Sequence, residues 1–208
     1  MIDLVCLVAD KNIEAAIEGI LQRPGALGIR EVQFEVIVHP NRDPGCFHQA
    51  SELLAGYRDS ARHALVVLDR AWDGAPADTG IELERQVEVL LRQSSLGDWA
   101  RALVLDPELE TWVFSDSPHV ASSLGWPEGI EALREALAGQ HLWQKQRVKP
   151  TDPKAAVEWA LRRAKKPRSS SMYRELAGTV GFARCQDHAF MRLRELLSGW
   201  FGGDSRED

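Results

Sequence analysis

The sequence predicts an α/β protein with a doubly wound, mainly parallel sheet and a helical extension at its C-terminal end. Short apolar runs alternate with amphipathic stretches over the first half of the chain. The runs begin about 30 to 40 residues apart, which is the length of a βαβ unit. Beyond Gly139 the apolar pattern has helical spacing only. These observations favour one parallel sheet followed by helices.

Four apolar runs are the expected strands. Residues 2–9 (IDLVCLVA) form a nearly continuous apolar run, which is typical of a strand that is buried on both faces in a parallel sheet. The runs at 32–38 (VQFEVIV), 64–68 (ALVVL) and 102–105 are the second, third and fourth expected strands. We therefore expect four parallel strands in the first 105 residues.

Amphipathic stretches separate these strands. Apolar residues keep helical spacing in 13–21, 47–57 and 83–91. Right-handed crossovers would place these helices on both faces of the sheet. After the fourth run, Asp106-Pro107 predicts a helix start, because aspartate caps free amides and proline suits the first helical position.

The same pattern predicts the domain organisation. We expect a core over residues 1–139, a helical extension over 140–201 packed on that core, and a flexible tail over 202–208. Residues 2–9 are too short to cross a membrane and lack a basic leader. Three widely spaced cysteines indicate no disulfide framework. A cytoplasmic protein with no membrane partner is the expectation.

Charge is distributed unevenly along the chain. The net charge is −6, but residues 1–140 carry 11 basic and 23 acidic side chains, whereas 141–168 carry nine basic and two acidic ones. An acidic body is a poor general surface for nucleic acid. Any contact with phosphate should therefore use the basic segment or a bound cation.

Acidic residues follow the expected strands. Asp10 follows the first run, Asp69 and Asp73 follow the third, and Glu108 follows the fourth. Ligands of open parallel sheets bind beyond the carboxyl ends of the strands, and magnesium prefers oxygen ligands. We expect Asp10, Asp69 and Asp73 to hold magnesium or manganese, with these three and Glu108 as the catalytic residues. Helix capping and turn chemistry are the structural alternative.

Two neighbouring features refine this site. Glu108 should point towards the sheet edge, with Glu110 half a turn further round the expected helix. Lys165, Lys166 and Arg168 precede serines in a polar loop, and cations before a helix N-terminus can hold a phosphate. If the protein handles a phosphodiester, this loop should face the acidic residues. A solvated run of charge is the alternative interpretation.

Common nucleotide and hydrolase motifs are absent from the sequence. There is no Gly-x-Gly-x-x-Gly, no Walker loop and no Gly-x-Ser-x-Gly elbow. The segments 4–12 (LVCLVADKN), 38–47 (VHPNRDPGCF), 106–126 and 185–193 (CQDHAFMRL) instead carry a resemblance. They resemble the TOPRIM-related family of bacterial defence islands, and are most similar there to the fourth component of methylation-associated antiphage defence systems.

The resemblance implies a metal-dependent fold that topoisomerases, primases and certain nucleases use. In that fold a glutamate after the first strand and an Asp-x-Asp pair after the third hold magnesium. This sequence departs from the pattern, because Asp10 stands near the expected glutamate and Arg70-Ala71 follows Asp69.

Two functions follow from the resemblance. One is a component of an antiphage defence system that acts as a magnesium-dependent nuclease on nucleic acid phosphodiesters. The alternative is a catalytically degenerate binding or assembly subunit of the defence complex, whose partners are other proteins of the defence operon. A third, weaker hypothesis is a protein that binds a small molecule or nucleotide at the same edge without metal.

Overall fold

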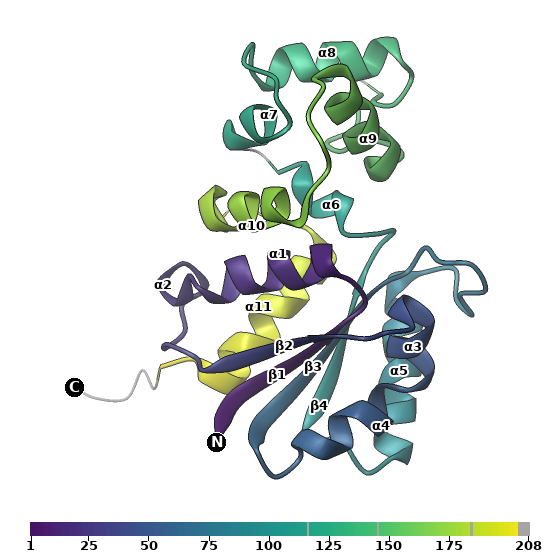
Figure 1. Ribbon diagram of the computed structural model, residues 1–208, viewed down its shortest axis with the longest axis vertical. Coiled ribbons are helices and arrows are strands. Elements are labelled where there is room, and N and C mark those ends of the chain that lie inside the picture. The colour runs from purple at the N-terminus through teal and green to yellow at the C-terminus, as the bar shows by residue number, and fades with distance from the viewer. Residues whose placement is uncertain (116, 145, 184, 204–208) are drawn as a thin grey trace.

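The central layer is a four-stranded parallel sheet (Figure 1). The structure is a computed structural model and describes residues 1–115, 117–144, 146–183 and 185–203. The strand order is β2-β1-β3-β4. The strands are β1 (Ile2–Val8), β2 (Phe34–Val38), β3 (Ala61–Asp69) and β4 (Ala100–Leu105). The doubly wound parallel sheet predicted from the sequence is confirmed.

The strand register brings the carboxyl ends of all four strands to one edge. Val8 pairs with Val38 of β2 and with Val67 of β3, and Asp69 pairs with Leu105 of β4. The chain passes from β1 to β2 on one side and then returns to β3 on the other side of β1. This reversal is a topological switch point, where ligands of such sheets commonly bind.

Helices cover both faces of the sheet (Figure 1). One face carries α1 and α11, and the other carries α3, α4 and α5. The helices of this layer are α1 (Lys11–Leu21), α2 (Pro24–Leu27), α3 (Arg42–His48), α4 (Ala50–Leu54), the short 3-10 helix η1 (Ala55–Tyr57), α5 (Gly80–Gln93) and α11 (His188–Phe201).

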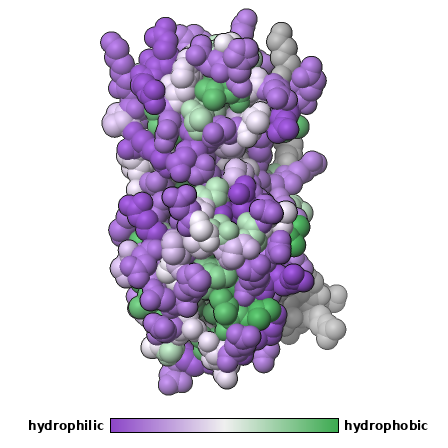
Figure 2. All heavy atoms as spheres, turned by 90° about the vertical axis from the view of Figure 1, so that its right-hand side faces the viewer, coloured by the Kyte–Doolittle hydropathy of each residue, from purple (hydrophilic) through white to green (hydrophobic). Residues whose placement is uncertain are grey.

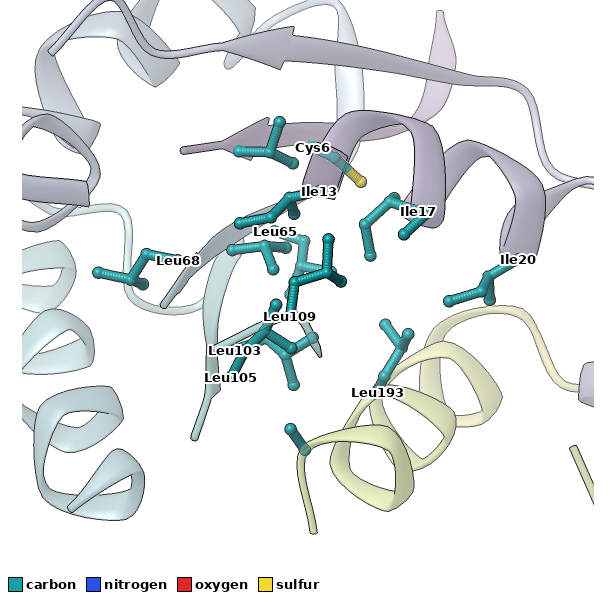
Figure 3. Packing of buried hydrophobic residues seen from close by; sticks show 14 of the residues in the cluster. Cys6, Ile13, Ile17, Ile20, Leu65, Leu68, Leu103, Leu105, Leu109 and Leu193 are labelled. Carbon is teal, nitrogen blue, oxygen red and sulfur yellow. The ribbon is translucent and has the colours of Figure 1, made fainter. Parts of the chain in front are cut away.

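The core lies on both sides of the central strands. Residues 4–8 of β1 and 64–68 of β3 have no exposed surface. On one face, Ile13 and Ile17 of α1 point towards side chains of the sheet, with Leu193 of α11 nearby (Figure 3). Fully burying one such aliphatic side chain stabilises the fold by about 1.5–3 kcal/mol. This core holds the carboxyl edge of the sheet in place.

A second group of helices lies beyond that edge (Figure 1). These are α6 (Glu110–Val113), α7 (His119–Ser123), α8 (Ile130–Gly139), α9 (Pro153–Arg163) and α10 (Ser170–Thr179). Within the group, α9 packs on α6 and α8, whereas α10 packs on α1. The helices of the expected extension, 140–201, therefore divide: α9 joins α6 and α8, α10 packs on α1 and α7, and α11 returns to the sheet.

The helix start predicted at Asp106-Pro107 is wrong, because α6 begins at Glu110. The carbonyl oxygen of Pro107 accepts hydrogen bonds from the backbone N–H groups of Arg70 (3.1 Å) and Ala71 (2.9 Å). These bonds hold residue 107 in a loop beside the end of β3. The Asp106 carboxylate instead accepts from the N–H of Gly80 at 2.7 Å, so that it caps α5.

The face of the molecule that Figure 2 presents is mostly hydrophilic. Figure 2 shows hydrophobic side chains in small patches between hydrophilic ones on the face that it presents. In the described ranges, no helix is long and apolar enough to cross a membrane. Of the tail expected at 202–208, Gly202 forms a bridge with Ile29, and residues 204–208 lie outside the described residues.

Candidate functional site

Five carboxylates gather at the carboxyl edge of the sheet, and we call this group the acidic edge. Each comes from a different place in the fold, and the negative charges of four of them raise the pKa of the fifth, Asp69. The acidic edge consists of Asp10 before α1, Asp43 in α3, Asp69 at the end of β3, Glu108 after β4 and Glu110 at the start of α6.

Asp69 links the loops on either side of it. Its Oδ1 atom accepts a hydrogen bond from the backbone N–H of Leu109 at 2.9 Å. Its own backbone N–H donates to Oδ1 of Asp43 at 2.8 Å. Burial raises the pKa of Asp69 well above its usual range, and the charges of the other four carboxylates raise it further. Asp69 therefore holds a proton more readily than an ordinary aspartate.

Two neighbouring aspartates also bind backbone amides. Oδ1 of Asp10 accepts from the N–H groups of Asn12 (2.8 Å) and Ile13 (2.9 Å), so Asp10 is the N-cap of α1. Such a cap contributes about 1 kcal/mol. Burial raises the pKa of Asp43, and the charge of Asp10 adds to this effect. Both aspartates thus help to fix the chain after their strands.

Glu108 is paired with a cation from α9. Its Oε2 atom lies 2.7 Å from Nζ of Lys154, and the glutamate is 7% exposed. Burial raises the pKa of Glu108, whereas the hydrogen bond from Lys154 lowers it. The same bond raises the pKa of Lys154. The pair ties α9 to the sheet edge.

Glu110, Tyr173 and Arg168 are joined to one another by hydrogen bonds and an ion pair. Only 1% of Glu110 is exposed, and the Tyr173 hydroxyl donates to its Oε1 atom at 2.6 Å. The Arg168 guanidinium also pairs with Glu110, and its Nε donates to the Tyr173 hydroxyl oxygen at 2.9 Å. Burial and the charge of Glu110 raise the pKa of Tyr173, so the phenol stays a donor.

The structure brings together three of the residues predicted as catalytic: Asp10, Asp69 and Glu108. Asp73 lies exposed in the loop after β3, and it is not among the carboxylates with the largest effect on the Asp69 pKa. Its role as a ligand stays a prediction. Glu110 is more deeply buried than Glu108, and both belong to the acidic edge. The greater importance of Glu108 for an ion or substrate stays a prediction.

Sequence reasoning missed Asp43 at this edge. Asp43 lies in a turn-rich segment after the second strand, where a carboxylate can reach the same edge as Asp10 and Asp69. Its position after a parallel strand was the signal that could have identified it.

The residues as they stand do not form a ready magnesium site. In the part of the chain that the structure describes, no three carboxylate, imidazole or thiol groups are arranged so that they could hold a metal ion. Glu108 and Glu110 already have cationic partners, and Oδ1 of Asp10 and Asp69 accepts backbone N–H groups. Magnesium or manganese binding stays a prediction.

The basic segment reaches the acidic edge through Lys154 and Arg168. Of the residues predicted to bind phosphate, Arg168 holds Glu110 and Tyr173, and Lys166 donates from Nζ to the carbonyl oxygen of Ser123 at 2.7 Å. Lys165 is exposed. Two of the three cations therefore bind groups of the protein itself.

Comparison of the chain with family models, with curated proteins and with solved structures found no match. The TOPRIM-related resemblance therefore stays a prediction from the sequence.

Proposed function

We propose that this chain is a binding or assembly subunit of a bacterial antiphage defence system, and that its acidic edge holds the fold together instead of cleaving phosphodiesters. The defence role rests on the resemblance of the sequence. The non-catalytic role rests on one observation above the others: the buried Glu110 carboxylate is held by Arg168 and Tyr173.

A metal-dependent nuclease needs carboxylates that can bind cations and protein cations that can bind phosphate. Arg168 is already paired with Glu110 and its Nε donates to Tyr173, so a phosphate would compete with these partners for its N–H groups. Because Glu110 is buried, the loss of its cation would leave a carboxylate charge in the interior without a partner, which is unfavourable.

The upward shift of the Asp69 pKa supports the same proposal. Its raised pKa reflects burial and the repulsion of four neighbouring carboxylates. A carboxyl group must lose its proton before it can bind a metal ion, so protons compete with magnesium there. Glu108 is engaged with Lys154, which leaves the edge held by its own cations and amides.

A nuclease is the second candidate, and one observation favours it. Oδ2 of Asp10 and Oδ2 of Asp69 accept no hydrogen bond from any described residue. A divalent cation near these oxygens would reverse the pKa shift of Asp69. In this hypothesis Asp10 and Asp69 would supply two of the ligands, and the metal would activate water.

A cleavage assay distinguishes the two candidates. Purified protein is incubated with single-stranded and double-stranded DNA and RNA in magnesium, manganese or EDTA. We expect no cleavage above the EDTA control with either metal. Cleavage that depends on metal and is abolished by Asp69→Asn, but retained by the exposed control Asp59→Asn, which lies before β3 at the opposite end of the strand, would contradict the proposal and support the nuclease.

A further inference from the structure

A cavity of about 680 Å³ lies between α1, α6, α10 and the start of α11. This volume falls within the range of about 300–1,000 Å³ that is typical of small-molecule sites. None of the five carboxylates of the acidic edge is among its described lining residues. The cavity is thus distinct from the acidic edge. Leu109 and Tyr173 lie between the two, because they line the cavity and are hydrogen-bonded to Asp69 and Glu110.

Aromatic side chains form much of the wall of this cavity. The Phe182 and Phe190 ring centroids lie 5.1 Å apart, and Trp112 meets Phe190 edge to face at 5.6 Å. The indole N–H of Trp112 donates to Oδ1 of Asp187 at 2.9 Å, which fixes the ring in its position. Fixed aromatic faces and edges suit another ring at similar distances.

The charged side chains that line the cavity favour an anionic ligand. Arg147 and Lys149 supply two cations to the lining, against the single carboxylate of Asp187. Lys149 pairs with Asp187 at 2.7 Å. The lining therefore carries a net positive charge, and Arg147 is the cation that Asp187 does not pair with.

We propose that this cavity binds a small molecule that combines an aromatic ring system with one anionic group. The rings would lie against Trp112, Phe182 and Phe190, and the anionic group would face Arg147. This inference is independent of the proposed assembly function, because it uses none of the residues of the acidic edge.

Two fluorescent probes test the proposal on the full chain. Anilinonaphthalene sulfonate carries aromatic rings and an anion, and phenylnaphthylamine carries the same rings without the charge. We expect saturable binding of one molecule of either probe per chain. The sulfonate should bind about threefold to fivefold more tightly, which corresponds to one partly exposed ion pair.

Three variants locate the binding. Val180→Trp introduces a large ring at a lining position and should weaken both probes about tenfold or more. Arg147→Gln changes an exposed side chain and should remove the preference for the sulfonate while leaving the neutral probe unaffected. Arg163→Gln, at an exposed position of α9 outside the cavity lining, is the matched control and should change neither affinity.

Each result decides a part of the proposal. Failure of the parent protein to bind either probe saturably would overturn it, as would unchanged binding in a folded Val180→Trp variant. If Val180→Trp does not fold, Arg147→Gln still tests the anionic group. Equal affinities for the two probes, unchanged by Arg147→Gln, would overturn the assignment of an anionic ligand.

Discussion

Asp69 makes the stability of the protein depend on pH in a defined direction. Burial and four carboxylates raise its pKa in the folded state, so between about pH 4 and that raised value the folded chain binds more protons than the unfolded chain. The ionisation of Asp69 therefore lowers the free energy of unfolding as pH rises through this range. Asp69→Asn keeps an oxygen that can accept from the Leu109 N–H while removing the charge.

We expect Asp69→Asn to raise the free energy of unfolding at pH 7 and the gain to shrink as pH falls towards about 4. Urea denaturation in EDTA at several pH values measures this difference. Asp73→Asn is the control, since its side chain is exposed, and it should change stability little at any pH. A loss of stability in Asp69→Asn at pH 7 would show that the native carboxylate is stabilised there.

The two tyrosines of the chain form a matched pair of tests. Tyr173 is 2% exposed and donates to the buried Glu110, whereas Tyr57 donates to Glu35 at 3.0 Å on the surface. Removing a buried hydrogen bond to a charged group should cost roughly 1.5–3 kcal/mol in Tyr173→Phe. Tyr57→Phe should cost less than about 0.5 kcal/mol. Equal losses in urea denaturation would contradict the role given to the Glu110 network.

Local sequence revealed part of the site because Asp10 and Asp69 directly follow apolar strands whose register the sheet then fixes. The cations that hold the glutamates could not be assigned in this way. Lys154 stands 46 residues from Glu108, and Arg168 stands 58 residues from Glu110. Which distant surfaces meet depends on the packing of whole helices, and no local periodicity encodes that.

At the scale of elements, apolar runs identified β1, β3 and β4 because strands buried on both faces are apolar nearly throughout. The run that identified β2 contains Glu35, because β2 lies at the edge of the sheet and is only partly buried. The first expected strand, 2–9, corresponds to β1 (Ile2–Val8), and the third, 64–68, lies within β3 (Ala61–Asp69). The start of α6 was missed, because the backbone bonds that hold Pro107 come from the loop after β3. The packing of α10 on α1 was also not predictable from local pattern.

The contact between α1 and α10 depends on Gly19. A Cβ atom there would lie 2.8 Å from Cβ of Ala177 and 2.9 Å from the carbonyl oxygen of Arg174. Gly19→Ala should therefore cost about 1–3 kcal/mol by forcing the helices apart, although alanine is the better helix former. Thermal or urea denaturation measures the loss.

Gly178, in α10 itself, is the control for this substitution. A Cβ atom at Gly178 would meet no heavy atom within 4 Å outside its own surroundings in the helix. Gly178→Ala should stabilise the protein by about 0.5–1 kcal/mol through helix propensity alone. A stabilising Gly19→Ala would contradict the close approach of α1 and α10.

At the scale of the whole molecule, charge separated along the sequence is brought together in the fold. The acidic first 140 residues and the basic segment 141–168 meet at the sheet edge through the pairs Glu108 with Lys154 and Glu110 with Arg168. The basic segment therefore neutralises the protein's own carboxylates there. This pairing is the physical basis for proposing an assembly subunit in preference to a nuclease.

Protection of cells against phage by the complete defence system, carrying either the parent chain or Asp69→Asn, tests this account most directly. The account predicts equal protection, because Asn keeps the acceptor for Leu109 and removes only a charge that the fold does not need. Asp59→Asn, at an exposed position before β3, serves as the surface control, and the amounts of each protein are compared in the same cells. Loss of protection in Asp69→Asn alone, with the protein folded and equally abundant, would contradict the account and assign chemistry to the acidic edge.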